Sequence, residues 1–145
     1  MTAPAAKSAY LDWLAGAMLG ARATPASSAP VDDLILGYAT GYDAADVAPF
    51  VRSLRAVFDG AVVLVVDQDP ALLAFLAENR IEVVAPAAVE GWAPHPVVAR
   101  FAAFDRLMSE RPQACNVLLT DVRDVVFQAA PFEPQPRGLE FFNEY

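Results

Sequence analysis

Short apolar runs alternate along this chain with stretches in which apolar residues recur three and four positions apart. Four runs have the length and aliphatic content of buried strands, namely Leu34–Thr40, Ala61–Val66, Ile81–Ala85 and Asn116–Thr120. Three intervening segments have helical spacing: one carries Val47 to Phe58, one runs from Pro70 to about Asn79, and one opens at Pro96. Strands that alternate with helices predict an α/β protein with a mostly parallel, Rossmann-like sheet flanked by helices.

Capping residues and prolines suggest where the predicted helices begin. Asp43 or Asp46 can cap the first helix, and Pro49 is tolerable only in the first turn of that helix. Asp69 followed by Pro70 has the pattern of an N-cap and a first-position proline. These signals place the starts of the first two helices shortly after the strands that precede them.

The first 30 residues are predicted to form a region apart from the α/β domain of residues 31–145. Ser8–Arg22 carries an apolar stripe typical of a helix, and the small residues of Ala23–Pro30 are typical of a linker. No apolar run reaches the roughly 18 residues of a membrane span, and the N-terminus lacks the basic cluster of a signal peptide. We therefore expect a cytoplasmic protein without a membrane span.

The C-terminal part lacks a regular pattern. Val125–Gln128 is expected to continue extended after a break, and the prolines at 131, 134 and 136 prevent regular structure beyond it. Leu139–Phe142 is a last apolar run with no partner after it in the 145 residues. This pattern favours a truncated or partial domain.

Composition and charge narrow the classes of function. Apolar residues make up 56% of the chain and charged residues 19%, which is typical of a folded domain. The net charge of −8 argues against a nucleic-acid partner, because phosphate contacts need clustered Lys and Arg. An acidic chain that handles a phosphorylated substrate needs a cation or a few well-placed arginines. The single Cys115 cannot form an internal disulfide.

Polar residues follow three of the predicted strands, at the ends where ligands bind in open α/β sheets. The three segments are Thr40-Gly41-Tyr42, Asp67-Gln68-Asp69 and Asp121-Val122-Arg123-Asp124. In the first segment, glycine lets a ligand approach the backbone, threonine offers a hydroxyl and tyrosine a stacking ring. Aspartate and glycine are also common turn residues, so each segment taken alone is explained by a plain turn without a ligand.

Asp121 and Asp124 are the candidate metal ligands. Positions three apart on a straight strand point to opposite faces, so the two carboxylates can share a cation only if the strand breaks between them. Two hard oxygen ligands suit Mg²⁺ or Mn²⁺ completed by water and substrate phosphates. The alternative interpretation makes Asp121 a turn or capping residue and Asp124 a salt-bridge partner of Arg123.

Two basic side chains add to this picture, and other chemistries lack support. Arg100, on the helix before the fourth strand, either reaches a diphosphate or is solvated. His95 lies between two prolines and is typical of a loop histidine. Neither Ser27-Ser28 nor Cys115 has a histidine placed for a nucleophile triad, and no GxGxxG or GxxxxGK[ST] motif occurs.

The order of these segments resembles the first half of a GT-A-type glycosyltransferase. The resemblance rests on Leu34–Thr40, Pro49–Arg55, Val62–Asp67, Val98–Phe101 and Val117–Phe132. Such enzymes place a nucleotide-binding loop after the first strand and a basic residue on a helix after the third. Asp121-Val122-Arg123-Asp124 is similar to the DxxD variant of their metal motif, which closes the fourth strand.

The resemblance implies a UDP- or GDP-linked nucleotide-diphospho-sugar as ligand and Mn²⁺ or Mg²⁺ as cofactor. Asp121 would face the ribose and metal, and Asp124 would ligate the metal. Thr40, Gly41 and Tyr42 would border the nucleotide and Asp67 the base or ribose. Arg100 would approach the diphosphate, and Arg123 would stack on the base or pair with phosphate. The residues that complete transfer belong to a second half, which we expect to lie outside the sequence as given.

Two alternatives remain at this point. Val62–Pro70 and Leu118–Arg123 resemble the opening and the phosphoacceptor strand of a response-regulator receiver domain, with Asp121 as the acceptor. That interpretation leaves too few residues after Asp121 and leaves Leu34–Thr40 unexplained. The other alternative is a non-catalytic α/β interaction module that forms a homo-oligomer through its Ala-rich N-terminal helix.

Overall fold

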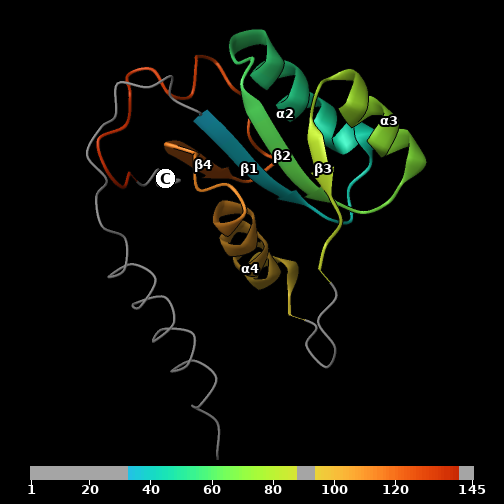
Figure 1. Cartoon of the computed structure of the whole chain (residues 1–145). Coiled ribbons are helices and arrows are strands. Elements are labelled where there is room, and N and C mark those ends of the chain that lie inside the picture. The colour runs from blue at the N-terminus through green and yellow to red at the C-terminus, as the bar shows by residue number, and fades with distance from the viewer. Residues whose placement is uncertain (1–32, 88–93, 141–145) are drawn as a thin grey trace, which may run out of the picture.

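The computed structural model describes residues 33–87 and 94–140, and the strand and helix predictions are confirmed there (Figure 1). The strands are β1 (Asp33–Ala39), β2 (Ala61–Val66), β3 (Glu82–Val84) and β4 (Asn116–Thr120). The helices are α2 (Ala44–Val57), α3 (Pro70–Glu78) and α4 (Pro96–Ser109). The predicted helix at Ser8–Arg22, its linker and the end of the Leu139–Phe142 run lie outside the described residues. No helix in these two ranges is long and apolar enough to cross a membrane.

The four strands form one parallel sheet in the order β3-β2-β1-β4. This is the order of the first four strands of the Rossmann fold. Helices α2 and α3 cover one face of the sheet, and α4 covers the other (Figure 1). The connections therefore leave β1 and enter β4 on opposite faces, which makes the carboxyl ends of these two neighbouring strands the switch point where α/β proteins bind ligands.

The strand order also bears on the receiver interpretation. In a receiver domain the phosphoacceptor strand is the direct neighbour of the strand that precedes the acidic pair. Here β1 lies between β2 and β4 and pairs with both. The sheet therefore has a Rossmann-like order and not the receiver order.

Two apolar cores fill the space between the sheet and its helices. On the α2 and α3 side, Ile35 and Leu64 from the sheet meet Phe50 of α2 and Leu76 of α3, each fully buried. On the α4 side, alternate positions of the same strands meet Phe104 and Leu107. Burial on both faces explains why the central strands read as continuous apolar runs in the sequence.

The segment after β4 completes the α2 side of the sheet. Val125–Gln128 is not a strand, and it packs against α2. The Phe127 ring meets Phe50 edge-on at 5.4 Å between ring centroids, and the Phe127 backbone N–H donates to Ser53 Oγ at 3.0 Å. The segment therefore extends the apolar packing on the α2 side of the sheet.

Helix α2 begins earlier than its proline suggested. Asp43 is the N-cap, with its carboxylate accepting from the backbone N–H groups of Ala45 and Asp46, and the Asp46 side chain accepts from the Asp43 N–H in return. Pro49 therefore lies inside the helix, and the expectation that it belongs to the first turn was wrong. The capping box and the burial of Val47 and Phe50 outweigh the backbone hydrogen bond that Pro49 cannot donate.

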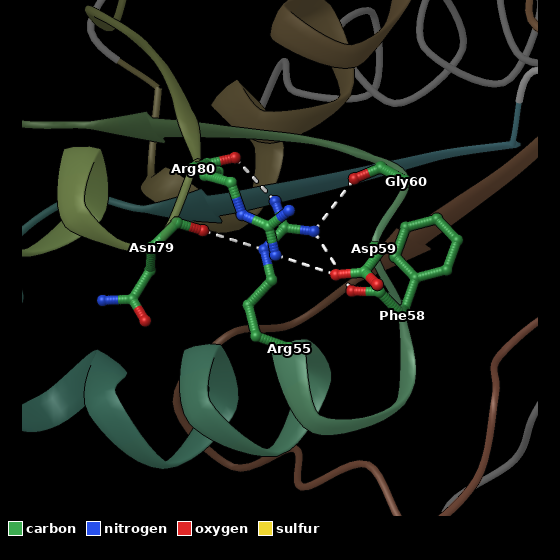
Figure 2. Close-up of polar contacts among 6 residues, drawn as sticks. All are labelled: Arg55, Phe58, Asp59, Gly60, Asn79 and Arg80. Carbon is green, nitrogen blue, oxygen red and sulfur yellow. Dashed lines mark hydrogen bonds and ion pairs between the residues drawn. The ribbon is translucent and has the colours of Figure 1, made fainter.

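Arg55, near the end of α2, ties three chain segments together (Figure 2). Its Nε donates to Asn79 O at 2.8 Å and its Nη2 to Arg80 O at 2.6 Å, both just after α3. Its Nη1 donates to Phe58 O at 3.2 Å and to Gly60 O at 2.9 Å, just before β2. Burial lowers the pKa of the guanidinium, Arg80 lowers it further and Asp59 raises it. The contacts lie at the amino edge of the sheet, opposite the predicted site.

Candidate functional site

The predicted site residues gather at the carboxyl edge of the sheet. Thr40 to Tyr42 follow β1, Asp67 follows β2, and Asp121 to Asp124 follow β4. Helices α2, α3 and α4 run antiparallel to the strands, so their N-termini, which carry partial positive charge, lie at this edge as well. Asp43 is the N-cap of α2 and Asp69 that of α3. His95 is the N-cap of α4, and its Nδ1 accepts from the Val97 N–H at 3.3 Å.

Gly41 and Asp67 join the ends of β1 and β2. The Gly41 N–H donates to Asp67 Oδ2 at 2.6 Å, and Gly41 has a φ of 80°, a conformation that favours glycine. A Cβ built on Gly41 meets no atom within 4 Å. The space beside Gly41 is therefore open, and the Asp67 carboxylate accepts from the backbone of this turn.

We expect Asp67→Ala to lower the free energy of unfolding by about 1 kcal/mol, because it removes one charge-assisted hydrogen bond at an exposed turn. Asp67→Asn keeps an acceptor oxygen at the same place and should cost less than half as much. Urea denaturation of the three proteins measures both values. Equal stabilities for the parent and Asp67→Ala would contradict this role of Asp67.

Arg100 and Asp121 form an ion pair at the end of β4. The Arg100 Nη1 contacts Asp121 Oδ1, which joins α4 to the first residue after the strand. The Arg100 guanidinium also lies over the Phe101 ring, with its carbon 5.1 Å from the ring centroid. These two side chains border a cavity of about 140 Å³ whose remaining walls include Phe101, Phe104 and Leu119. The sequence had assigned them to different groups of a ligand and had not paired them with each other.

Val122 fixes the turn that carries the acidic residues, and the sequence analysis overlooked it. Its side chain is buried in the core on the α2 side, against Gly37 of β1. Asp121 and Arg123 on either side of it remain exposed. A single apolar residue among charged neighbours was the available signal, because it marks the one position of the turn that faces the core.

Tyr42 and Arg123 form a second contact at this edge. The Arg123 guanidinium carbon lies 5.7 Å from the centroid of the Tyr42 ring, and Tyr42 packs partly against the core on the α2 side. The Tyr42 side chain is half-buried and that of Arg123 is exposed. Arg123 and Asp124 are not among the ion pairs of the described residues, so the structural alternative for Asp124 is not observed.

The break expected between Asp121 and Asp124 falls before both residues. Strand β4 ends at Thr120, so Asp121 and Asp124 follow a break and are not held on opposite faces of a strand. Both are exposed, and two carboxylates suit Mg²⁺ or Mn²⁺, which keep several waters and bind substrate phosphates. The described ranges contain no group of three or more His, Cys, Asp or Glu side chains arranged around one point. Within the same ranges, the side chains of Thr40 and Asp124 form no hydrogen bond or ion pair with the other site residues.

These features define the class of protein. The chain is an α/β protein with a Rossmann-like, all-parallel sheet, and its polar residues collect where that fold binds ligands. Comparisons with protein-family models, curated proteins and solved structures found no significant match.

Proposed function

We propose that the carboxyl edge of this sheet binds a nucleotide-diphospho-sugar together with Mn²⁺ or Mg²⁺, as the donor-binding part of a GT-A-type glycosyltransferase. The observation that carries the proposal is the meeting of Arg100 with Asp121 beside the switch point between β1 and β4. A metal–diphosphate complex requires a positive group for the diphosphate and a negative group for the cation. Arg100 and Asp121 supply these two groups side by side.

The charge of this edge favours a cation-dependent ligand over a free anion. Asp43, Asp46, Asp67, Asp69, Asp121 and Asp124 all lie at the carboxyl ends of the strands or the starts of α2 and α3. Arg100 on α4 and Arg123 after β4 are the two basic site residues, and together with the six aspartates they give a formal charge of −4. A diphosphate approaching this edge alone is repelled, and a divalent cation offsets that repulsion.

Each side chain then has a role that follows from its position. The Tyr42 ring and the Arg123 guanidinium offer a surface on which a nucleobase stacks, and Gly41 lets the nucleotide approach the backbone. Arg100 pairs with the diphosphate, and Asp121 and Asp124 hold the cation. When bound, the cation neutralises the charge that the diphosphate gains as the bond to the sugar breaks.

Calorimetric titration of the protein with UDP and with GDP, with and without Mn²⁺, tests this proposal. We expect one nucleotide to bind in a Mn²⁺-dependent way. Asp124→Ala should weaken that binding tenfold to hundredfold, which is about 1.4–2.7 kcal/mol. Binding that ignores Mn²⁺, or no binding, with Asp124→Ala behaving as the parent does, would overturn it.

Asp59→Ala is the matched control for this experiment. Asp59 is also an exposed aspartate, but it lies before β2 at the opposite edge of the sheet and pairs with Arg80. It changes the net charge by the same amount as Asp124→Ala. Nucleotide affinity within about twofold of the parent is expected, since charges beyond a Debye length are largely screened.

A further inference from the structure

The proposed function assigns Arg100 to the diphosphate and Asp121 to the cation, but in the structure these two side chains form an ion pair with each other. The guanidinium that would meet the diphosphate contacts the carboxylate that would meet the cation. The Arg100 side chain is 27% exposed and that of Asp121 58%, so both ligands can reach the pair from solvent. The Phe101 ring adds a second contact to the guanidinium. The Arg100 guanidinium therefore has two partners, Asp121 and Phe101, and the pair keeps part of its surface in solvent.

A cation or a diphosphate that arrives alone is repelled by the member of the pair that has the same sign of charge. A cation that approaches Asp121 encounters the Arg100 guanidinium at contact distance, and an anion that approaches Arg100 encounters the Asp121 carboxylate. Each has to break the pair and leaves one of its members without a partner. A cation and a diphosphate that arrive together replace one ion pair by two and also bind each other.

We infer that this ion pair acts as a latch that makes divalent-cation binding and diphosphate binding at the carboxyl edge mutually dependent. The inference rests on the proposed function and adds a regulation of the same site. Because coupling between two ligands is reciprocal, the cation raises the affinity for the diphosphate by the factor by which the diphosphate raises that for the cation. In the absence of the nucleotide, the latch keeps Asp121 from collecting free metal ions.

The latch predicts that breaking the pair tightens the binding of each ligand by itself. Arg100→Gln should bind Mn²⁺ alone about three- to tenfold more tightly than the parent, because a partly exposed ion pair and one repelling charge are removed. Asp121→Asn is the mirror test and should bind UDP without metal about three- to tenfold more tightly, because Arg100 is released. Mn²⁺ binding is measured by electron paramagnetic resonance of the free ion, and UDP binding by calorimetry.

Arg106→Gln is the matched control. Arg106 is on α4 as well and pairs with Glu110 at 3.4 Å, one turn later in the same helix and away from the carboxyl edge. It removes the same charge and also breaks an ion pair. Its Mn²⁺ affinity should stay within about twofold of the parent, because the lost charge is distant and screened. Circular dichroism confirms that each variant is folded.

The possible results separate the latch from the function on which it rests. Tighter binding of Mn²⁺ to Arg100→Gln than to Arg106→Gln, together with tighter metal-free UDP binding to Asp121→Asn, supports the latch. Mn²⁺-dependent UDP binding by the parent, with no gain in either variant, overturns the latch and leaves the proposed function standing. Absence of both UDP and GDP binding by the parent at every Mn²⁺ concentration, corrected for the Mn²⁺–nucleotide complex in a protein-free titration, overturns both.

Discussion

Replacing Arg55 with alanine is expected to lower the free energy of unfolding by about 3 kcal/mol. The substitution removes four hydrogen bonds from one charged side chain to backbone carbonyls, those of Phe58, Gly60, Asn79 and Arg80. Hydrogen bonds to charged groups each contribute about 1.5–3 kcal/mol. Because the four carbonyls are partly exposed, water replaces part of these bonds in the variant, and the loss of stability is well below the sum of four such contributions. Urea denaturation followed by circular dichroism measures the loss.

Two further variants test whether the loss of stability in Arg55→Ala is caused by the loss of the flat, multiply donating guanidinium. Arg55→Lys should recover less than half of the loss, because an ammonium group cannot reach carbonyls on both sides as the flat guanidinium does. Arg80→Ala removes the exposed Arg80–Asp59 pair from the same region and should change stability by less than about 0.5 kcal/mol. If Arg55→Ala were no more destabilising than Arg80→Ala, the role assigned to Arg55 would be wrong.

Gly37→Val should destabilise the protein by about 3 kcal/mol and disturb the turn at the end of β4. A Cβ at position 37 comes within 2.6 Å of Leu64 Cδ2 and 2.6 Å of Val122 Cγ2. Both side chains are fully buried, and Val122 has little rotamer freedom with which to retreat. Overpacking of a filled core costs about 1–3 kcal/mol, and the two extra methyl groups place valine at the upper end. Thermal and urea unfolding check this value.

A double-mutant cycle tests whether Val122 is the side chain that resists. Gly37→Ala combined with Val122→Ala should be less destabilising than the sum of the two single changes, because the second removes one of the clashing methyl groups. Gly41→Ala is the conformational control: its Cβ meets open space, so only the positive φ is penalised, by about 1 kcal/mol. Simple additivity in the cycle would mean that Val122 does not set the limit at Gly37.

The sequence predicted the strands well because both cores need them. Ala61–Val66 is apolar at every position, since alternate residues face α2 and α4, and the structure gives it the predicted bounds. Asp43 and Asp46 were both candidate caps, and Pro49 was expected in the first turn. The Asp43 capping box and the burial of Phe50 set the earlier start, which places Pro49 inside the helix. Propensity alone does not measure what tertiary packing contributes.

The sequence predicted which residues lie at the candidate site but not which of their side chains contact one another. Sheet order cannot be read from the order of strands in the sequence, so the approach of Arg100 to Asp121 and of Arg123 to Tyr42 became visible only once β4 was placed beside β1. Spacing also could not reveal that Val122 turns inward and fixes its neighbours. Metal binding by Asp121 and Asp124 stays a prediction, since carboxylates at a turn have the same spacing with or without an ion.

The central position of β1 has a consequence for the order in which the protein assembles. Its contacts with β2 close a loop of modest length, but its contact with β4 joins Asp33 to Asn116 across 83 residues. Long loops lose more entropy on closure, so pairing of β1 with β4 is expected to be a late step of folding. On a ribosome, the part of the carboxyl edge formed by β1 and β2 can be in place while the residues of β4 are still inside the exit tunnel. Competence to bind a ligand between β1 and β4 would then be acquired last, when most of the domain is already folded.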